Sequence, residues 1–252
     1  MSESNANSIY GNYTTLAVPM FTLVTSVLAP ISTSFMPRLS ESSLKGDKKK
    51  FSESFGQIFL ITVLISVPAS LAMFFYSFDL LDVLFSVQSS ALGAELLICL
   101  SLGVCLLSML TVVNTALESK GRIFSTVISL LVGAAVKIIV SYALIGSSYG
   151  ILGAPIGSVF SYFVSLIISI FALELTGVKT RAFRTCISLY LIGTLAFYFP
   201  YEFIYRRGFF ASSFSSMLIS LALSFALYVT LLIIVYIFLL RKSVLKINKK
   251  AY

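Results

Sequence analysis

The chain has 252 residues, of which 58% are hydrophobic and only 11% charged, and its formal net charge is +8. A water-soluble domain of this length needs far more charge to cover its surface, so this composition excludes a soluble globular protein. Most of the 18 basic residues fall in alternate connections between apolar runs and at the C-terminus, which is the pattern of membrane topology and argues against nucleic-acid binding.

The apolar runs are too long and too continuous for β-barrel strands. Crossing the hydrocarbon core takes roughly 20 apolar residues in a helix, whereas barrel strands alternate polar and apolar residues over about 10 positions. The runs at 58–75 and 217–240 fit only the helical pattern. Because lipid offers backbone amides no hydrogen-bond partner, we predict an all-α fold, a polytopic membrane helix bundle of about seven transmembrane helices.

The first predicted span covers residues 13–36 and follows a polar segment, 1–12. A connection comes next whose basic residues are Arg38, Lys45, Lys48, Lys49 and Lys50. The second predicted span, 54–78, is interrupted by Pro68. The segment 79–94 carries two acids and no base, and it is too apolar for a free loop, so we expect it to lie in the membrane interface.

The next three spans are predicted at 95–117, 123–146 and 151–175. A short basic turn containing Lys120 and Arg122 joins the first two of them, and an uncharged turn joins the second to the third. A further basic segment follows the third of these spans, with Lys179, Arg181 and Arg184.

The last two spans are predicted at 185–205 and 216–240, and a basic tail, 241–252, ends the chain. We expect residues 13–175 to form a five-helix portion of a larger helical lobe and residues 176–240 to add two further transmembrane helices.

Basic connections alternate with connections that carry little or no positive charge, which is the positive-inside signature. This pattern predicts a multi-pass protein of the plasma membrane with an odd number of spans. The segment 1–12 is then extracytoplasmic, and the tail 241–252 is cytoplasmic.

The chain contains no histidine and nothing that resembles a Walker A loop, a zinc-protease helix or a nucleophile elbow. The lack of histidine removes imidazole proton relays, haem ligation and most zinc sites. We therefore expect no enzyme activity, no catalytic residue, no bound metal and no cofactor.

Lys137 is the one charged residue near the centre of a predicted span. A lysine ammonium at the membrane midplane costs at least ~2.5 kcal/mol. The residues at four-residue spacing from it are Ser125, Ser129, Gly133 and Ser141, a polar stripe that suits a helix bordering a hydrated cavity. Lys137 either lines such a cavity, where it meets a phosphate or replaces a bound cation, or is structural and bonds to carbonyls of a neighbouring helix.

Asn114 is a second polar residue inside a predicted span. An interhelical hydrogen bond worth ~1 kcal/mol is the simpler account of this residue, and a place in a substrate cavity is the alternative. Gly153 and Gly157 stand four residues apart at the start of the fifth span, a spacing that permits close helix packing.

Several short motifs occur in an order and spacing that resemble a known transporter family. They are Tyr10-Gly-Asn-Tyr-Thr, Leu16-Ala-Val-Pro, Phe35-Met-Pro-Arg-Leu-Ser, the GDKKKF connection, Leu117-Glu-Ser-Lys-Gly-Arg, Lys137 and Gly150-Ile-Leu-Gly-Ala-Pro-Ile-Gly. Over roughly residues 8 to 175 the chain resembles the polysaccharide-transporter family of the multidrug/oligosaccharidyl-lipid/polysaccharide exporter superfamily. The resemblance is closest to the subgroup that includes stage V sporulation protein B and lipid II flippases.

The resemblance implies a membrane flippase of lipid-linked oligosaccharide or polysaccharide precursors, with two lobes around a cationic cavity that holds the substrate's pyrophosphate. Seven spans with an extracytoplasmic N-terminus correspond to the C-terminal half of a fourteen-helix member. Alternating access needs two lobes, so the chain is expected to need a missing N-terminal lobe or partner chain and to be inactive alone. Lys137, and after it Asn114, are the residues that the resemblance places at the cavity.

Two other functions stay open. A cation-coupled multidrug exporter of the same superfamily ranks second, because it normally relies on membrane-embedded acids and no acid lies near the centre of a predicted span. A non-transporting membrane remnant or assembly factor is the third alternative.

Overall fold

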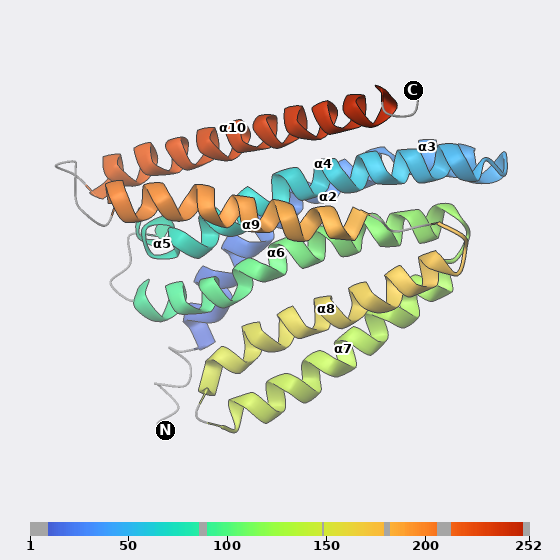
Figure 1. Ribbon diagram of the computed structural model, residues 1–252. Coiled ribbons are helices and arrows are strands. Elements are labelled where there is room, and N and C mark those ends of the chain that lie inside the picture. Colours follow the sequence, from blue (N-terminus) through green and yellow to red (C-terminus); the bar gives the residue numbers. More distant parts are fainter. Residues whose placement is uncertain (1–9, 86–89, 148, 179–181, 206–212, 249–252) are drawn as a thin grey trace. The chain divides into compact units, whose positions relative to one another are not determined.

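The computed structural model describes residues 10–85, 90–147, 149–178, 182–205 and 213–248, and every element within these ranges is helical (Figure 1). The elements in chain order are η1 (Asn12–Ala17), α2 (Val18–Ser34), α3 (Met36–Leu44), α4 (Lys48–Phe75), α5 (Ser77–Phe85), α6 (Ser90–Ser119), α7 (Ile123–Ile145), η2 (Gly150–Leu152), α8 (Gly153–Glu174), α9 (Ala182–Pro200), η3 (Tyr201–Tyr205) and α10 (Ser213–Asn248). The all-α fold predicted from the apolar runs is confirmed.

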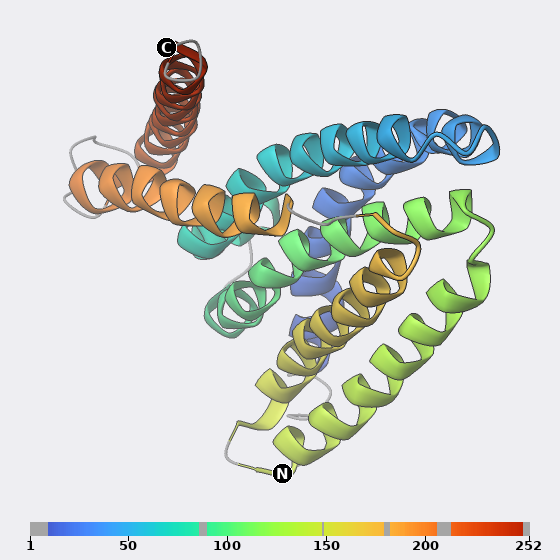
Figure 2. The ribbon, with the colours of Figure 1, turned by 45° about the vertical axis from the view of Figure 1, so that its right-hand side comes forward.

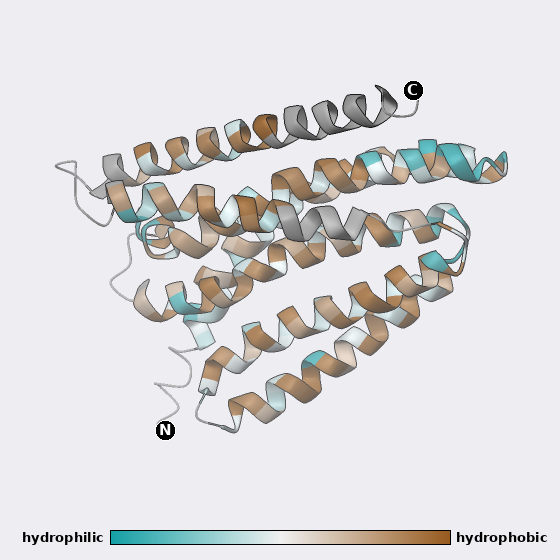
Figure 3. Cartoon of the chain, viewed as in Figure 1, coloured by the Kyte–Doolittle hydropathy of each residue, from teal (hydrophilic) through white to brown (hydrophobic). Residues whose placement is uncertain are grey.

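Six helical stretches within the described residues are long and apolar enough to cross a bilayer. They are Asn12–Leu44, Lys48–Phe75, Ala91–Ser119, Ile123–Ile145, Gly150–Glu174 and Met217–Ile234. The predicted span at 185–205 is also helical, as α9 and η3, but is not among these six. The chain is a polytopic membrane helix bundle, and most of the length of its helices is apolar (Figure 3).

The basic segment after the first span was predicted to be a connection between helices. This prediction is wrong for most of its length, because the segment is helical. α3 carries Pro37 in its first turn, where proline's missing N–H is not needed. α4 begins at Lys48, and the Asp47 side chain accepts a hydrogen bond of 3.0 Å from the Lys50 backbone nitrogen. Only residues 45–47 separate the two helices. Sequence reasoning ended the helices where the charged residues begin. Water satisfies charged side chains on a helix, however, so the helices continue beyond the apolar runs.

The chain divides into two compact units, residues 1–187 and 188–252. In the first unit α6 is the central helix, with 67% of its most apolar window buried, against 17% for α7. α6 packs against α2, α4, α5 and α8, whereas α7 packs chiefly against α8 along one side (Figure 2). The buried core of this unit comprises Leu16, Ala17, Met20, Phe21, Leu28, Met73, Leu81, Ala94, Leu96, Leu97, Leu100 and Val104.

Serine side chains join α4 to α6 inside this core. The Ser70 hydroxyl donates a hydrogen bond of 2.8 Å to the Ser101 carbonyl, and Ser66 Oγ lies 3.7 Å from Cys105 Sγ. Lipid tails are as apolar as leucine, so burial alone gives no preference for helix–helix contact in a membrane. Small residues and interhelical hydrogen bonds supply that preference here.

The contact between α7 and α8 is closer still, because glycines allow the backbones to approach. A Cβ atom added at Gly153 would lie 2.7 Å from Leu144 Cβ and 2.9 Å from the Ile145 nitrogen. A Cβ at Gly157 would collide with Ser141 Oγ and lie 3.1 Å from the Lys137 carbonyl oxygen. Both glycines therefore face α7 at positions where no larger residue fits the observed geometry.

In the second unit, η3 packs against α10, and α10 buries a face on which residues recur every four positions. Ser220, Ser224 and Tyr228 occupy this face, and the Ser224 hydroxyl donates to the Ser220 carbonyl at 2.8 Å. Four-residue spacing places these side chains on one side of the helix.

Substituting Gly153→Ala is expected to destabilise the chain by about 1–3 kcal/mol, because the added methyl group meets a Cβ and a backbone nitrogen that cannot move independently of α7. The measurement is the midpoint of thermal unfolding of the detergent-solubilised protein. The matched control is Gly56→Ala on α4, where an added Cβ has no neighbour within 4 Å. This control should be neutral or slightly stabilising, since alanine favours a helix over glycine by roughly 0.5–1 kcal/mol. Equal midpoints for the two variants would contradict the close approach of α7 and α8.

Candidate functional site

A network of polar side chains ties α6, α7 and α8 together in the first unit. Asn114 on α6 is 9% exposed, and its Oδ1 accepts a hydrogen bond of 2.9 Å from the Ser169 hydroxyl on α8. Ser169 Oγ lies 2.8 Å from Ser129 Oγ on α7, and the Ser165 hydroxyl donates to the Ser129 carbonyl at 2.9 Å. Because lipid cannot satisfy these groups, their pairing across three helices stabilises this arrangement.

Asn114 thus makes an interhelical hydrogen bond, as the simpler of its two predicted accounts requires. Sequence reasoning missed its partner, Ser169, and the neighbouring Ser165, which bonds to Ser129. A signal for them was present, because Gly153, Gly157, Ser161, Ser165 and Ser169 recur every four residues and so form one small-residue face of α8. This spacing predicts that α8 packs against another helix through this face, but it does not predict which hydroxyl pairs with Asn114.

Lys137 lies in the interior of α7, a helix that is otherwise mostly apolar (Figure 3). Its backbone carbonyl is beside Gly157 of α8, yet its side chain is exposed. Among the residues that the structure describes, none forms a hydrogen bond or ion pair with its ammonium group. The predicted bond from Lys137 to carbonyls of a neighbouring helix is therefore not observed within the described part of the chain.

The polar stripe around Lys137 has a different role from the one expected. Ser129 and Gly133 are buried, and together with Ser141 Oγ they face α8 rather than an open space. These small residues let the two helices approach. Lys137 and Asn114 are not brought together, because Ser129, the α7 member of the Asn114 network, precedes Lys137 by eight residues, about 12 Å along the helix.

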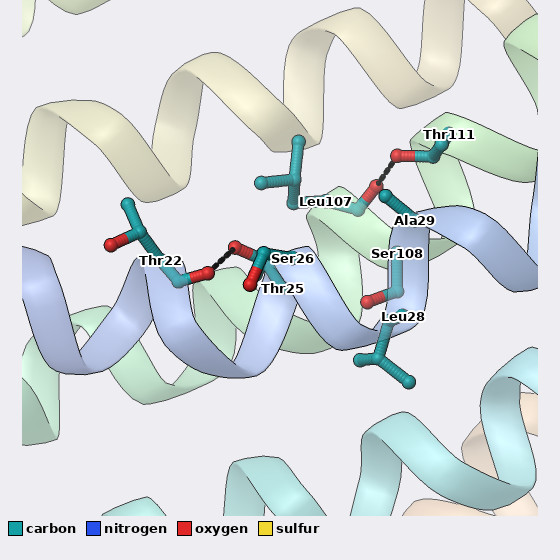
Figure 4. Close-up of a pocket in the computed structure, with 8 residues that line it drawn as sticks. All are labelled: Thr22, Thr25, Ser26, Leu28, Ala29, Leu107, Ser108 and Thr111. Atoms are coloured by element: carbon teal, nitrogen blue, oxygen red, sulfur yellow. Dashed lines mark hydrogen bonds between the residues drawn. The ribbon is translucent and has the colours of Figure 1, made fainter.

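A cavity of about 290 Å³ lies between α2 and α6 (Figure 4). Its lining residues are Thr22, Thr25, Ser26, Leu28, Ala29, Leu107, Ser108 and Thr111. The hydroxyls donate to carbonyls of their own helices; Thr22, for example, donates to Pro19 at 2.9 Å and Ser108 to Val104 at 2.6 Å. The cavity therefore offers oxygen lone pairs and methyl groups but no charge, which suits water or an uncharged hydroxylated group. Sequence reasoning missed this cavity, since it depends on how α2 meets α6.

Several basic residues of the first unit lie together at one end of its helices. Lys120, just after α6, donates a hydrogen bond of 3.0 Å to Thr176 Oγ1 beyond α8. Its ammonium also lies 4.4 Å from the ring centroid of Phe51 in the first turn of α4, a cation–π contact. Burial, followed by the positive charges of Lys48 and Arg122, lowers the pKa of Lys120. The connections between α3 and α4 and between α6 and α7 thus share one end, as the positive-inside pattern requires of alternate connections.

Comparisons with known proteins agree with this architecture. A family model described as "Lipid II flippase MurJ" matches residues 6–205 of the chain. A curated relative, "Uncharacterized membrane protein MJ1068" of Methanocaldococcus jannaschii, is 27% identical over 163 residues, which is 65% of this chain and 32% of the relative. The chain thus spans about a third of that relative's length. Since the family match covers most of the chain, including the whole α6–α7–α8 bundle, the protein belongs to the lipid II flippase MurJ family.

Proposed function

We propose that this chain is the C-terminal part of a membrane flippase for lipid-linked oligosaccharide or polysaccharide precursors, and that it transports only together with an N-terminal lobe or partner chain. Family membership supports the flippase class, and the stage V sporulation protein B-like subgroup remains our finer assignment from the motifs. The need for a second lobe follows from alternating access, in which two lobes rock around a site between them.

The single observation that carries the proposal is the exposed position of Lys137 inside α7. α7 has 23 residues, about 35 Å of helix, and Lys137 stands eight residues, about 12 Å, from its C-terminal end. A lysine facing lipid at this depth costs at least ~2.5 kcal/mol, and its flexible chain reaches only part of the way to the surface. An exposed position on a helix covered along one side is favourable only if that face meets water or an anion from outside the first unit.

A lipid-linked sugar carries such an anion, the pyrophosphate between its lipid and its sugar. We infer that Lys137 contacts this pyrophosphate in a cavity that the proposed second lobe completes. Asn114 is the second candidate for this cavity, but its hydrogen bond to Ser169 shows that it also holds α6 against α8. The uncharged hydroxyl-lined cavity between α2 and α6 is compatible with the neutral sugar portion of the same substrate.

Lys137→Glu is expected to abolish flipping by the chain assembled with its N-terminal lobe, because it places a carboxylate where the pyrophosphate binds. Lys137→Arg should retain most of the rate, since the cation is kept. Flipping is measured in proteoliposomes with a fluorescent lipid-linked oligosaccharide and a membrane-impermeant quencher. The unfolding midpoint should change little in the arginine variant, because no described partner is lost. Normal flipping by Lys137→Glu would make the residue structural.

The chain alone is expected not to flip lipid-linked oligosaccharide in proteoliposomes, whereas the chain co-purified with the proposed N-terminal lobe or partner chain should do so. The reason is that one lobe cannot enclose a site that opens alternately to each side. Transport by the chain alone would remove the requirement for a partner. No transport in either preparation would favour the alternative of a non-transporting remnant or assembly factor.

The proposed orientation is tested by single cysteines at the two opposite ends of the first unit's helices. In a background in which Cys99, Cys105 and Cys186 are alanine, Lys49→Cys should resist a membrane-impermeant maleimide in intact cells, and Ser147→Cys should react. Lys49 lies at the basic end of the unit and Ser147 follows α7 at the other end, and both are exposed. Labelling of both sites from the same side would overturn the predicted topology.

A further inference from the structure

The turn between α6 and α7 holds two basic side chains at a defined place. Gly121 has a φ of +73°, a left-handed conformation that glycine adopts without strain. The Gly121 nitrogen donates to the Glu118 carbonyl at 2.8 Å, and the Arg122 nitrogen donates to the Leu117 carbonyl at 2.9 Å. This helix-ending motif fixes the backbone of Lys120 and Arg122 directly below the first turn of α7.

A third cation completes the cluster. Lys120 is anchored on the ring of Phe51 and on Thr176, and both Lys48 and Arg122 are close enough to act on its charge. Within the described ranges, no carboxylate forms an ion pair with any of these three cations, in contrast to Lys45, which is paired with Glu41. Three cations that lie close together and are not ion-paired repel one another, so an anion placed among them is stabilised by all three.

The apolar face that adjoins this cluster distinguishes between possible anions. Phe124, Ile128 and Leu131 of α7 are 84%, 55% and 64% exposed. Their spacing of four and three residues puts them in one row that starts beside Arg122. A free phosphate would use only the cations, whereas a phospholipid would use the cations for its headgroup and the row for an acyl chain.

We propose that the cluster of Lys48, Lys120 and Arg122, with the row of Phe124, Ile128 and Leu131, is a binding site for an anionic phospholipid. The phosphodiester lies among the three cations, and one acyl chain lies along α7. Basic pockets between transmembrane helices are suited to such headgroups, and each lysine or arginine near a membrane surface contributes roughly a fivefold preference for anionic lipid. This site is independent of the flippase proposal, since it uses none of the residues assigned there.

The chain contains no tryptophan, so a single introduced tryptophan reports on its own surroundings. Phe124→Trp is reconstituted in vesicles of phosphatidylcholine with a small fraction of brominated phosphatidylglycerol, or with the same fraction of brominated phosphatidylcholine. We expect the anionic brominated lipid to quench its fluorescence at least threefold more efficiently. The matched control is Tyr142→Trp, 85% exposed at the other end of α7, where the two lipids should quench equally.

The role of the charges is tested in the Phe124→Trp background. The double substitution of Arg122→Gln with Lys48→Gln should remove the preference for phosphatidylglycerol, because each of these cations contributes roughly a fivefold preference. Lys120 is left unchanged because it holds three helix ends together. Lys45→Gln, which removes a cation already paired with Glu41, should leave the preference intact.

Two results would overturn the proposal. One is equal quenching of Phe124→Trp by the two brominated lipids, or a preference that survives loss of Arg122 and Lys48. The other is full loss of the preference on adding millimolar inorganic phosphate at constant ionic strength, which would identify a free-anion site instead of a lipid site.

Discussion

Lipid gives no hydrogen bonds and no hydrophobic preference for one helix over another, and the helical bundle of the first unit is built around this constraint. Its helices are held by small residues that allow close approach and by hydroxyls that pair across the contacts. Gly153 and Gly157 bring α8 against α7, while Ser169 links Asn114 on α6 to Ser129 on α7. Several polar groups inside the spans pair in this way, so a charged side chain inside a span that has no such partner among the described residues is informative.

Lys137 is such a group. Its backbone carbonyl takes part in the α7–α8 contact, but the residue is exposed. The energetic cost of a cation in lipid is the reason why we propose that a second lobe meets this face of α7. The same reasoning separates Lys137 from the cations at the end of the unit, which lie where headgroups and water are available and therefore need no protein partner.

The basic residues at the helix ends of the first unit also take part in tertiary packing. Lys120 contacts residues from α4 and from the turn after α8 although it follows α6, so the basic end is a packed structure and not a fringe of loose side chains. Its cations border an exposed apolar row on α7, and this combination of charge and apolar surface matches the two parts of a phospholipid. The same few residues thus pack the helix ends together and are the ones on which the predicted topology and the proposed lipid contact rest.

Apolar run length and charge position in the sequence alone determined the helical membrane class and the approximate spans, because both follow from the local requirement of a bilayer for about 20 apolar residues per helix. The family resemblance came from short motifs in a particular order and spacing. Sequence reasoning placed the helix limits less well, as at α3, since charged residues can continue a helix beyond the hydrocarbon. Only the tertiary structure decided that Ser129, Gly133 and Ser141 face α8, that Asn114 bonds to Ser169, and that Lys120 meets Phe51. These contacts join residues distant in the chain, and periodicity can show that a helix has a polar face but not which helix that face meets.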